Sequence, residues 1–144
     1  MPFIYRLQKI LNLRIQKKKE QLQVVLELER EINRIQEKIN QNKNTIFTLR
    51  KNMYSAPHIM LENYDIYIRY LNDIIEQLEE EKSSLVQRKQ EEMKKLEEME
   101  KGIKALEKHK EKVYEEYLEE QNKTEMRIMD ETAGLRHYAK TEEE

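Results

Sequence analysis

The spacing of apolar residues after residue 60 is the feature that most limits what this chain can fold into. From Leu61 to Tyr117, apolar side chains recur at alternating intervals of three and four residues. The series is Leu61, Tyr64, Ile68, Leu71, Ile75, Leu78, Lys82, Leu85, Lys89, Glu92, Leu96, Met99, Ile103, Leu106, Lys110, Val113 and Tyr117, in which only the three lysines and Glu92 are not apolar. This spacing keeps one seam facing a partner and is typical of a coiled coil.

The first third of the chain carries the same pattern. It runs through Leu28, Ile32, Ile35, Ile39, Asn42, Ile46, Leu49 and Met53. Upstream of this series, Leu22, Val25 and Leu28 are each three residues apart. Two successive intervals of three predict a local change in the winding of the helices.

A short break, "YSAPHIML", separates the two series. Pro57 is tolerated only in the first turn of a helix, and Ser55 is a candidate N-cap. Two long helices joined by so few residues run antiparallel. We therefore predict an all-α fold: two long helices that form an antiparallel coiled-coil hairpin, with the C-terminal helix overhanging. The predicted single domain, 1–144, comprises a helix over 3–53, a tip over 54–58, a helix over 59–139 and a tail over 140–144.

Composition narrows the classes of function. Charged residues make up 39% of the chain, and there are only two Gly and no Cys, so the core is thin and there is no disulfide or thiolate chemistry. The net charge of -2 gives the whole molecule no overwhelming attraction for nucleic acid or anionic lipid, and we expect no nucleic acid as a partner. No stretch approaches the roughly 18 to 20 apolar residues that span a bilayer, so we expect a cytosolic protein.

No candidate active site stands out. His58, His109 and His137 are far apart in sequence, which argues against a metal site. Gly102 and Gly134 stand alone, so there is no phosphate-binding loop. We predict no catalytic residues, no metal, no cofactor and no small-molecule substrate.

The opening "FIYRLQKILNLR" has apolar residues on more than one face of a helix. Reflecting the chain about the tip pairs Leu49 with Tyr64 and Leu7 with about Leu106, so this segment lies at the base of the overhang. The seam-facing residues would be Ile4, Leu7 and Leu11, whereas Phe3, Ile10 and Leu13 would point elsewhere. Two interpretations stay open: the segment widens a local core, or both chain ends enter a cavity in another protein.

Charge is distributed unevenly between the two chain ends. The first 19 residues hold six basic residues and no acid, whereas Glu115 to Glu144 hold ten acids and four bases. Such blocks can steer docking to a partner, although each run taken separately is better explained as a solvated face.

A second apolar anomaly is "NYDIYIRYLNDIIEQL". Ile66, Tyr67, Tyr70 and Ile74 fall outside the seam and share the outward side of the second helix. They predict either a partner site or a thicker local core.

Three segments in order resemble the family of the flagellar type III export protein FliJ. The opening "FIYRLQKILNLR" is similar to the start of that family, "NYDIYIRYLNDIIEQL" to its Tyr-containing segment, and "EMRIMDETAGLRHY" to its closing motif. The likeness covers nearly the whole chain.

The resemblance implies a non-enzymatic stalk of the export apparatus, located in the cytoplasm and peripherally associated with the inner membrane at the flagellar base. Its implied partners are the hexameric flagellar export ATPase, the membrane export gate protein and export chaperones. The residues implied to bind the ATPase ring are Phe3, Tyr5, Leu7, Leu11, Arg14, Met129, Asp130, Glu131 and Arg136. Those implied to bind the gate are Tyr67, Leu71, Ile74 and Leu78.

Three alternatives stay open. The runner-up is the corresponding stalk of a virulence type III secretion system, which this one sequence barely distinguishes. The others are a structural coiled-coil tether with no ATPase partner and a helical arm detached from an enzyme.

Overall fold

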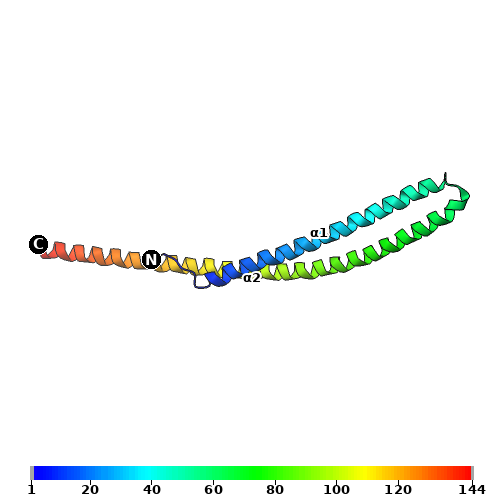
Figure 1. Ribbon diagram of the computed structural model, residues 1–144. Coiled ribbons are helices and arrows are strands. Elements are labelled where there is room, and N and C mark those ends of the chain that lie inside the picture. Colours follow the sequence, from blue (N-terminus) through cyan, green and yellow to red (C-terminus); the bar gives the residue numbers. More distant parts are fainter. Residues whose placement is uncertain (1, 144) are drawn as a thin grey trace. The chain divides into compact units, whose positions relative to one another are not determined.

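A computed structural model describes the backbone of residues 2–143 and the side chains of residues 2–140. Helix α1 spans Gln8–Met53, a short 3-10 helix spans His58–Met60, and helix α2 spans Leu61–Glu143 (Figure 1). Residues 2–143 contain no strand. The predicted all-α fold built on two long helices is therefore confirmed. The chain divides into two compact units, Lys17–Met99 and the pair Met1–Gln16 with Glu100–Glu144, which are described in turn.

In the unit Lys17–Met99, the two helices lie antiparallel and side by side (Figure 1). Its core is a cluster of buried aliphatic residues: Ile35, Ile39, Ile46, Ile68, Leu71 and Ile75. Each belongs to the seam that the sequence predicts, and Ile39 is the most enclosed, at 2% exposed. Burial of one stripe from each helix is what stabilises such long helices in water.

Polar residues occupy the seam between this core and Met99. Lys82 donates a hydrogen bond from Nζ to Oε1 of Gln36, at 2.6 Å. Gln21 donates from Nε2 to the backbone oxygen of Glu92, at 2.9 Å, and to its carboxylate. Gln21 and Glu92 are the partners that reflection about the tip places opposite each other. Because polar seam pairs are satisfied only in one register, they favour this alignment of the helices.

The seam upstream of Val25 differs from the prediction. Leu22 is 41% exposed, whereas Gln21 is half-buried. The residues that turn inward are Ile15, Lys18 and Gln21, so the two successive intervals of three lie at 15, 18 and 21. The side-chain amide of Gln21 donates hydrogen bonds to the backbone and carboxylate of Glu92. Because these bonds hold Gln21 in the seam, Leu22 faces outward.

The tip follows Met53 and is built differently than predicted, since α2 begins at Leu61 and not at residue 59. At the end of α1, backbone N–H groups donate hydrogen bonds to the carbonyl oxygen three residues earlier. One of them joins Ser55 N to Asn52 O at 3.3 Å. Ser55 also donates its hydroxyl to Asn52 O, at 3.4 Å, so it ends α1 and does not cap the next helix. Pro57 takes the capping place before the 3-10 helix, with φ -59° and ψ 143°, and that turn leads into α2.

In the unit formed by Met1–Gln16 and Glu100–Glu144, the N-terminal segment lies along α2. Helix α1 begins at Gln8, five residues later than predicted. The preceding segment is non-helical, so its side chains alternate: Phe3 is half-buried, Ile4 is 82% exposed and Tyr5 is 5% exposed. The expectation that Ile4 faces the seam and Phe3 points away is therefore wrong.

The last part of α2 has no neighbour within this unit. Every side chain described after Gln121, up to Lys140, is exposed. In Figure 1 the orange-to-red part of α2 runs without another segment beside it. Helix α2 also continues to Glu143, beyond the predicted end at 139, and residue 144 lies outside the described residues.

Candidate partner-binding surfaces

The N-terminal residues of the predicted ring-binding set build the interior of their own unit. Tyr5 and Leu11 are 5% and 3% exposed, and Phe3 and Leu7 are half-buried. The Phe3 ring packs between Tyr114 and Tyr117, with centroid distances of 5.0 and 5.4 Å. These placements support the local-core interpretation for this segment.

Tyr5 and Arg14 tie the segment to the backbone of α2. The Tyr5 hydroxyl lies 2.7 Å from Nδ1 of His109 and 3.4 Å from the carbonyl oxygen of Leu106. Arg14, whose side chain is exposed, donates from Nη1 to the carbonyl oxygen of Gly102 at 3.3 Å. A Cβ at Gly102 would lie 3.3 Å from the same Nη1 atom, so the glycine leaves room for this close approach.

The C-terminal residues of the same set are all exposed. Met129 is 70% exposed, and Asp130, Glu131 and Arg136 also face solvent. Met129 and Arg136 line a shallow depression on the helix surface, together with Ile128, Thr132, Ala133, His137, Ala139 and Lys140. The structure therefore divides the predicted ring-binding residues between a packed N-terminal group and a free C-terminal group.

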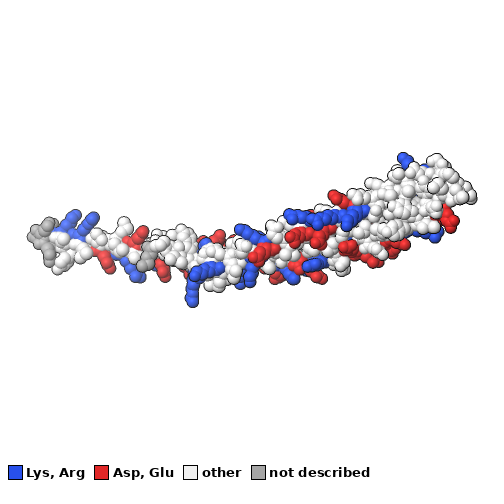
Figure 2. Space-filling view, viewed as in Figure 1, with Lys and Arg blue, Asp and Glu red and all other residues white. Residues whose placement is uncertain are grey.

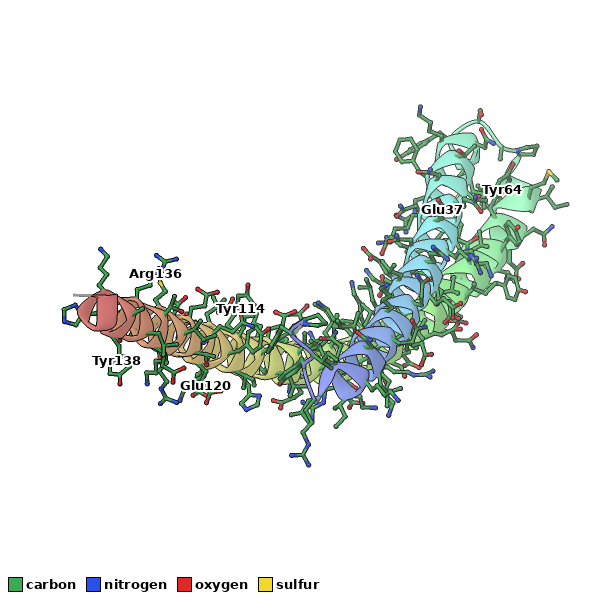
Figure 3. All side chains as sticks on the ribbon, turned by 90° about the vertical axis from the view of Figure 1, so that its left-hand side faces the viewer. Glu37, Tyr64, Tyr114, Glu120, Arg136 and Tyr138 are labelled. Carbon is green, nitrogen blue, oxygen red and sulfur yellow. The ribbon has the colours of Figure 1, made fainter. Side chains whose placement is uncertain are left out.

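Three further apolar residues of this segment belong with the free group. Ile128, Leu135 and Tyr138 are 57%, 70% and 65% exposed, and they continue the three-and-four spacing of the seam beyond Tyr117. We call Ile128, Met129, Leu135 and Tyr138 the C-terminal apolar surface. Figure 3 shows Arg136 and Tyr138 leaving the helix on opposite sides, so apolar and cationic groups alternate around it. The sequence signal for these residues was the continued spacing.

The predicted gate-binding residues are only partly accessible. Leu71 is 5% exposed and belongs to the core cluster, while Ile74 and Leu78 are half-buried against it. Tyr67 is 46% exposed, and its ring stacks on Tyr70 at a centroid distance of 6.3 Å. Of the four residues outside the seam, only Ile74 fits the thicker-core interpretation, and an exposed face remains at Tyr67.

Two more residues extend the exposed face at Tyr67. Ile66 and Tyr70 are each 59% exposed on the same helix. Both lie outside the seam spacing, which was the signal in the sequence. We call Ile66, Tyr67 and Tyr70 the tyrosine surface.

The carboxylate of Glu92 has a lowered pKa. The hydrogen bond from Gln21 lowers the pKa of Glu92 below its ordinary value of 4.5, and a second bond from Lys95 acts in the same direction. Both bonds stabilise the charged form. This carboxylate is held by neighbours that favour its ionised state, so it serves the seam and not acid catalysis.

Within residues 2–140 no three His, Cys, Asp or Glu side chains lie close enough together to hold a metal ion. Neither long helix, over its described length, contains an apolar stretch sufficient to cross a membrane.

Comparison with known proteins gives one match. The family model described as "Flagellar FliJ protein" matches residues 3–142. No curated protein and no solved structure matches the chain.

Proposed function

The chain belongs to the flagellar FliJ protein family, which ties its role to flagellar export, and from this premise we propose that it is a non-enzymatic stalk of the export apparatus. In this role the C-terminal part of α2 inserts into the hexameric export ATPase. The chain supplies shape and stiffness, and nucleotide hydrolysis belongs to the ring.

One observation carries the proposal. Residues 122–140 are helical and exposed, yet they keep an apolar series in the seam spacing. A helix that shows Ile128 and Leu135 to water has apolar surface that a partner can bury. Ten acids and four bases between Glu115 and Glu144 add a charge that a basic cavity would attract.

We choose the residues proposed to contact the ring by the exposure of their side chains. We assign that contact to the C-terminal apolar surface, with Asp130, Glu131 and Arg136 at its edge. Tyr5 and Leu11 act indirectly, because their burial holds the N-terminal segment on α2. Phe3, Leu7 and Arg14 have enough exposed surface to touch the ring at the base of the helix.

The proposal is tested by ATPase assembly. Purified chain should promote hexamerisation and turnover of the export ATPase, and Ile128→Ser with Leu135→Ser should lower the apparent affinity at least about tenfold, since two apolar contacts are lost. Met93→Ser is the matched control, because Met93 is 43% exposed on the same helix outside this surface. Unchanged hexamerisation and turnover on adding the wild-type chain would refute the stalk and favour the structural tether.

A second contact follows from the tyrosine surface. We propose that Tyr67, with Ile66 and Tyr70, meets the membrane export gate protein, and that Ile74 and Leu78 contribute their exposed edges while Leu71 supports the helix from within. Export chaperones are further proposed partners. Tyr67→Ala with Tyr70→Ala should weaken gate binding in a pull-down and leave ATPase stimulation unchanged; loss of both activities together would contradict two separate surfaces.

The proposed location is the cytoplasm, at the inner membrane beneath the flagellum. The match to a flagellar family model supports this system over the corresponding virulence secretion stalk. The distinguishing experiment is genetic: deletion of the gene should abolish flagellar filaments, and deletion that spares filaments while blocking another secretion system would reverse the choice.

A further inference from the structure

An outward-facing stripe ends helix α1. Phe47 and Tyr54 are 64% and 94% exposed and are seven residues apart, while Arg50 and Lys51 lie three and four residues after Phe47. This spacing places the four side chains on one face of the helix end. The opposite face is occupied by Ile46, Leu49 and Met53, which pack in the core.

Apolar residues are also exposed in the tip that follows α1. Ile59 and Met60, in the 3-10 helix, are 86% and 47% exposed. We call Phe47, Arg50, Lys51, Tyr54, Ile59 and Met60 the tip surface. Aromatic and aliphatic side chains project here from the turn that joins two helices, so the surface is convex. A bound peptide needs a groove in which to bury its side chains. A convex apolar surface is therefore better suited to a partner that can deform around it.

The tip surface is also basic, unlike the chain as a whole. No acidic residue occurs between Lys38 and Leu61, and Arg50 and Lys51 of the tip surface lie in this segment, whereas the whole chain has a net charge of -2. Lys43, in the same segment, forms an ion pair with Glu79 of α2 at 3.8 Å. Lys51 Nζ lies 5.2 Å from the centroid of the Phe47 ring, so cation and aromatic ring are presented together. In Figure 2 the tip end of the molecule is largely uncharged on the face in view, with Lys or Arg at its upper edge and both acidic and basic groups at its lower edge.

The nearest acids only partly offset this charge. Asp65 forms an ion pair with Arg69 at 3.1 Å, so its charge is compensated within α2. Glu62 follows in the first turn of α2, where the helix dipole favours a negative charge. The excess cations therefore remain on the α1 side of the tip, next to the exposed aromatic rings.

We propose that the tip surface docks on the surface of an anionic lipid bilayer. Tyr, Phe, Ile and Met enter the boundary between headgroups and acyl chains, and Arg50 and Lys51 contact the anionic headgroups. The chain rests on the bilayer without crossing it. This contact is separate from ATPase binding and uses residues outside the C-terminal apolar surface.

Vesicle flotation of the full chain tests the proposal. The chain should float with phosphatidylcholine vesicles that contain phosphatidylglycerol, float weakly with phosphatidylcholine alone, and dissociate as salt is raised. Tyr54→Ser with Ile59→Ser should reduce partitioning by roughly tenfold, as should Arg50→Glu with Lys51→Glu. Equal binding to neutral vesicles, or no binding to anionic ones, would overturn the proposal and leave the tip as a protein contact.

Matched controls come from the same chain. Leu135→Ser with Tyr138→Ser removes apolar groups of similar exposure, and Lys104→Glu with Lys108→Glu reverses two exposed charges elsewhere on α2. Both should float like the wild type. Similar losses in these controls would show that net charge or hydrophobicity, and not the tip, drives binding.

A fluorescent probe reports depth directly, because the chain has no Trp. Tyr54→Trp should shift its emission to shorter wavelength on anionic vesicles and be quenched by brominated acyl chains, while Tyr138→Trp should do neither. An unshifted Tyr54→Trp spectrum under conditions where the chain floats would overturn insertion by the tip. ATPase stimulation should be the same for all tip variants, so failure here is distinguishable from failure of the stalk proposal.

Discussion

The hydroxyl of Tyr5 lies 2.7 Å from Nδ1 of His109, a residue 104 positions further along the chain. The two rings also contact each other in a tilted arrangement, at a centroid distance of 5.7 Å and an interplanar angle of 52°. With Tyr5 only 5% exposed, this pair fastens the segment before α1 to the surface of α2. The N-terminal residues of this chain therefore have a packing role, whatever they contact besides.

Removing the Tyr5 hydroxyl separates hydrogen bonding from ring packing. Tyr5→Phe should lower the free energy of unfolding by about 0.5 to 1.5 kcal/mol, the net worth of a typical hydrogen bond. Tyr5→Ala should cost about 3 to 5 kcal/mol, because the buried ring is lost as well. Urea denaturation followed by circular dichroism measures both. Tyr138→Phe, at a 65% exposed site, should leave the free energy of unfolding unchanged. An equal loss in both variants would show that the hydrogen bond of Tyr5 does not stabilise the fold.

Substitutions at the adjacent residues Phe3 and Ile4 should have opposite effects on the packing of the N-terminal segment. Phe3→Ser should loosen the aromatic contacts with Tyr114 and Tyr117, worth about 0.5 to 1.5 kcal/mol beyond area burial, and should expose the N-terminal segment to protease. Ile4→Ser should leave proteolysis unchanged, since Ile4 is 82% exposed. If Ile4→Ser were the more damaging change, the non-helical start of the chain would be contradicted.

The lowered pKa of Glu92 predicts an acid-sensitive seam. A carboxyl whose pKa is lower in the folded state contributes stability above its unfolded pKa, and loses that contribution as pH falls through the folded value. The wild type should therefore lose stability below the ordinary value of 4.5, and Gln21→Ala, which removes the main cause, should lose less over that range. Denaturation in urea across this pH range measures the difference.

The exposed neighbour Glu91 provides the control for this pH dependence. Glu91→Gln should retain the wild-type slope of stability against pH, whereas Glu92→Gln should flatten it. Titration of the Glu92 carboxyl by NMR gives an independent reading. A pKa at or above the ordinary value would show that the bond from Gln21 does not hold in solution.

Gly102 and Gly134 differ in what surrounds them. Alanine relieves the helix penalty of glycine, up to about 1 kcal/mol at either position. At Gly102 the new Cβ meets Arg14 Nη1 at 3.3 Å, and because that atom ends a flexible side chain it can move. We expect Gly102→Ala to stabilise the fold and Gly134→Ala, in open space, to slow amide exchange in the C-terminal part of α2. Destabilisation by Gly102→Ala would mean that Arg14 is held in place.

The long helices were predictable because their signal is local. Alternating intervals of three and four residues specify one apolar stripe, and every position of the predicted series from Leu61 to Tyr117 is buried or half-buried, including Lys82, Lys89, Glu92 and Lys110. Local spacing also marked three exposed apolar residues. Ile66 and Tyr70 lie outside the apolar stripe, and Leu135 lies in the part of α2 that has no helix packed beside it.

The sequence by itself thus determined that the chain is helical, where its break lies and which stripe is apolar, since these depend on residues a few positions apart. Only the tertiary structure decided that Phe3 turns inward and Ile4 outward, and that Gln21 replaces Leu22 in the seam. Each of these choices depends on a contact with residues far away in the chain, and helical periodicity carries no information about such a contact.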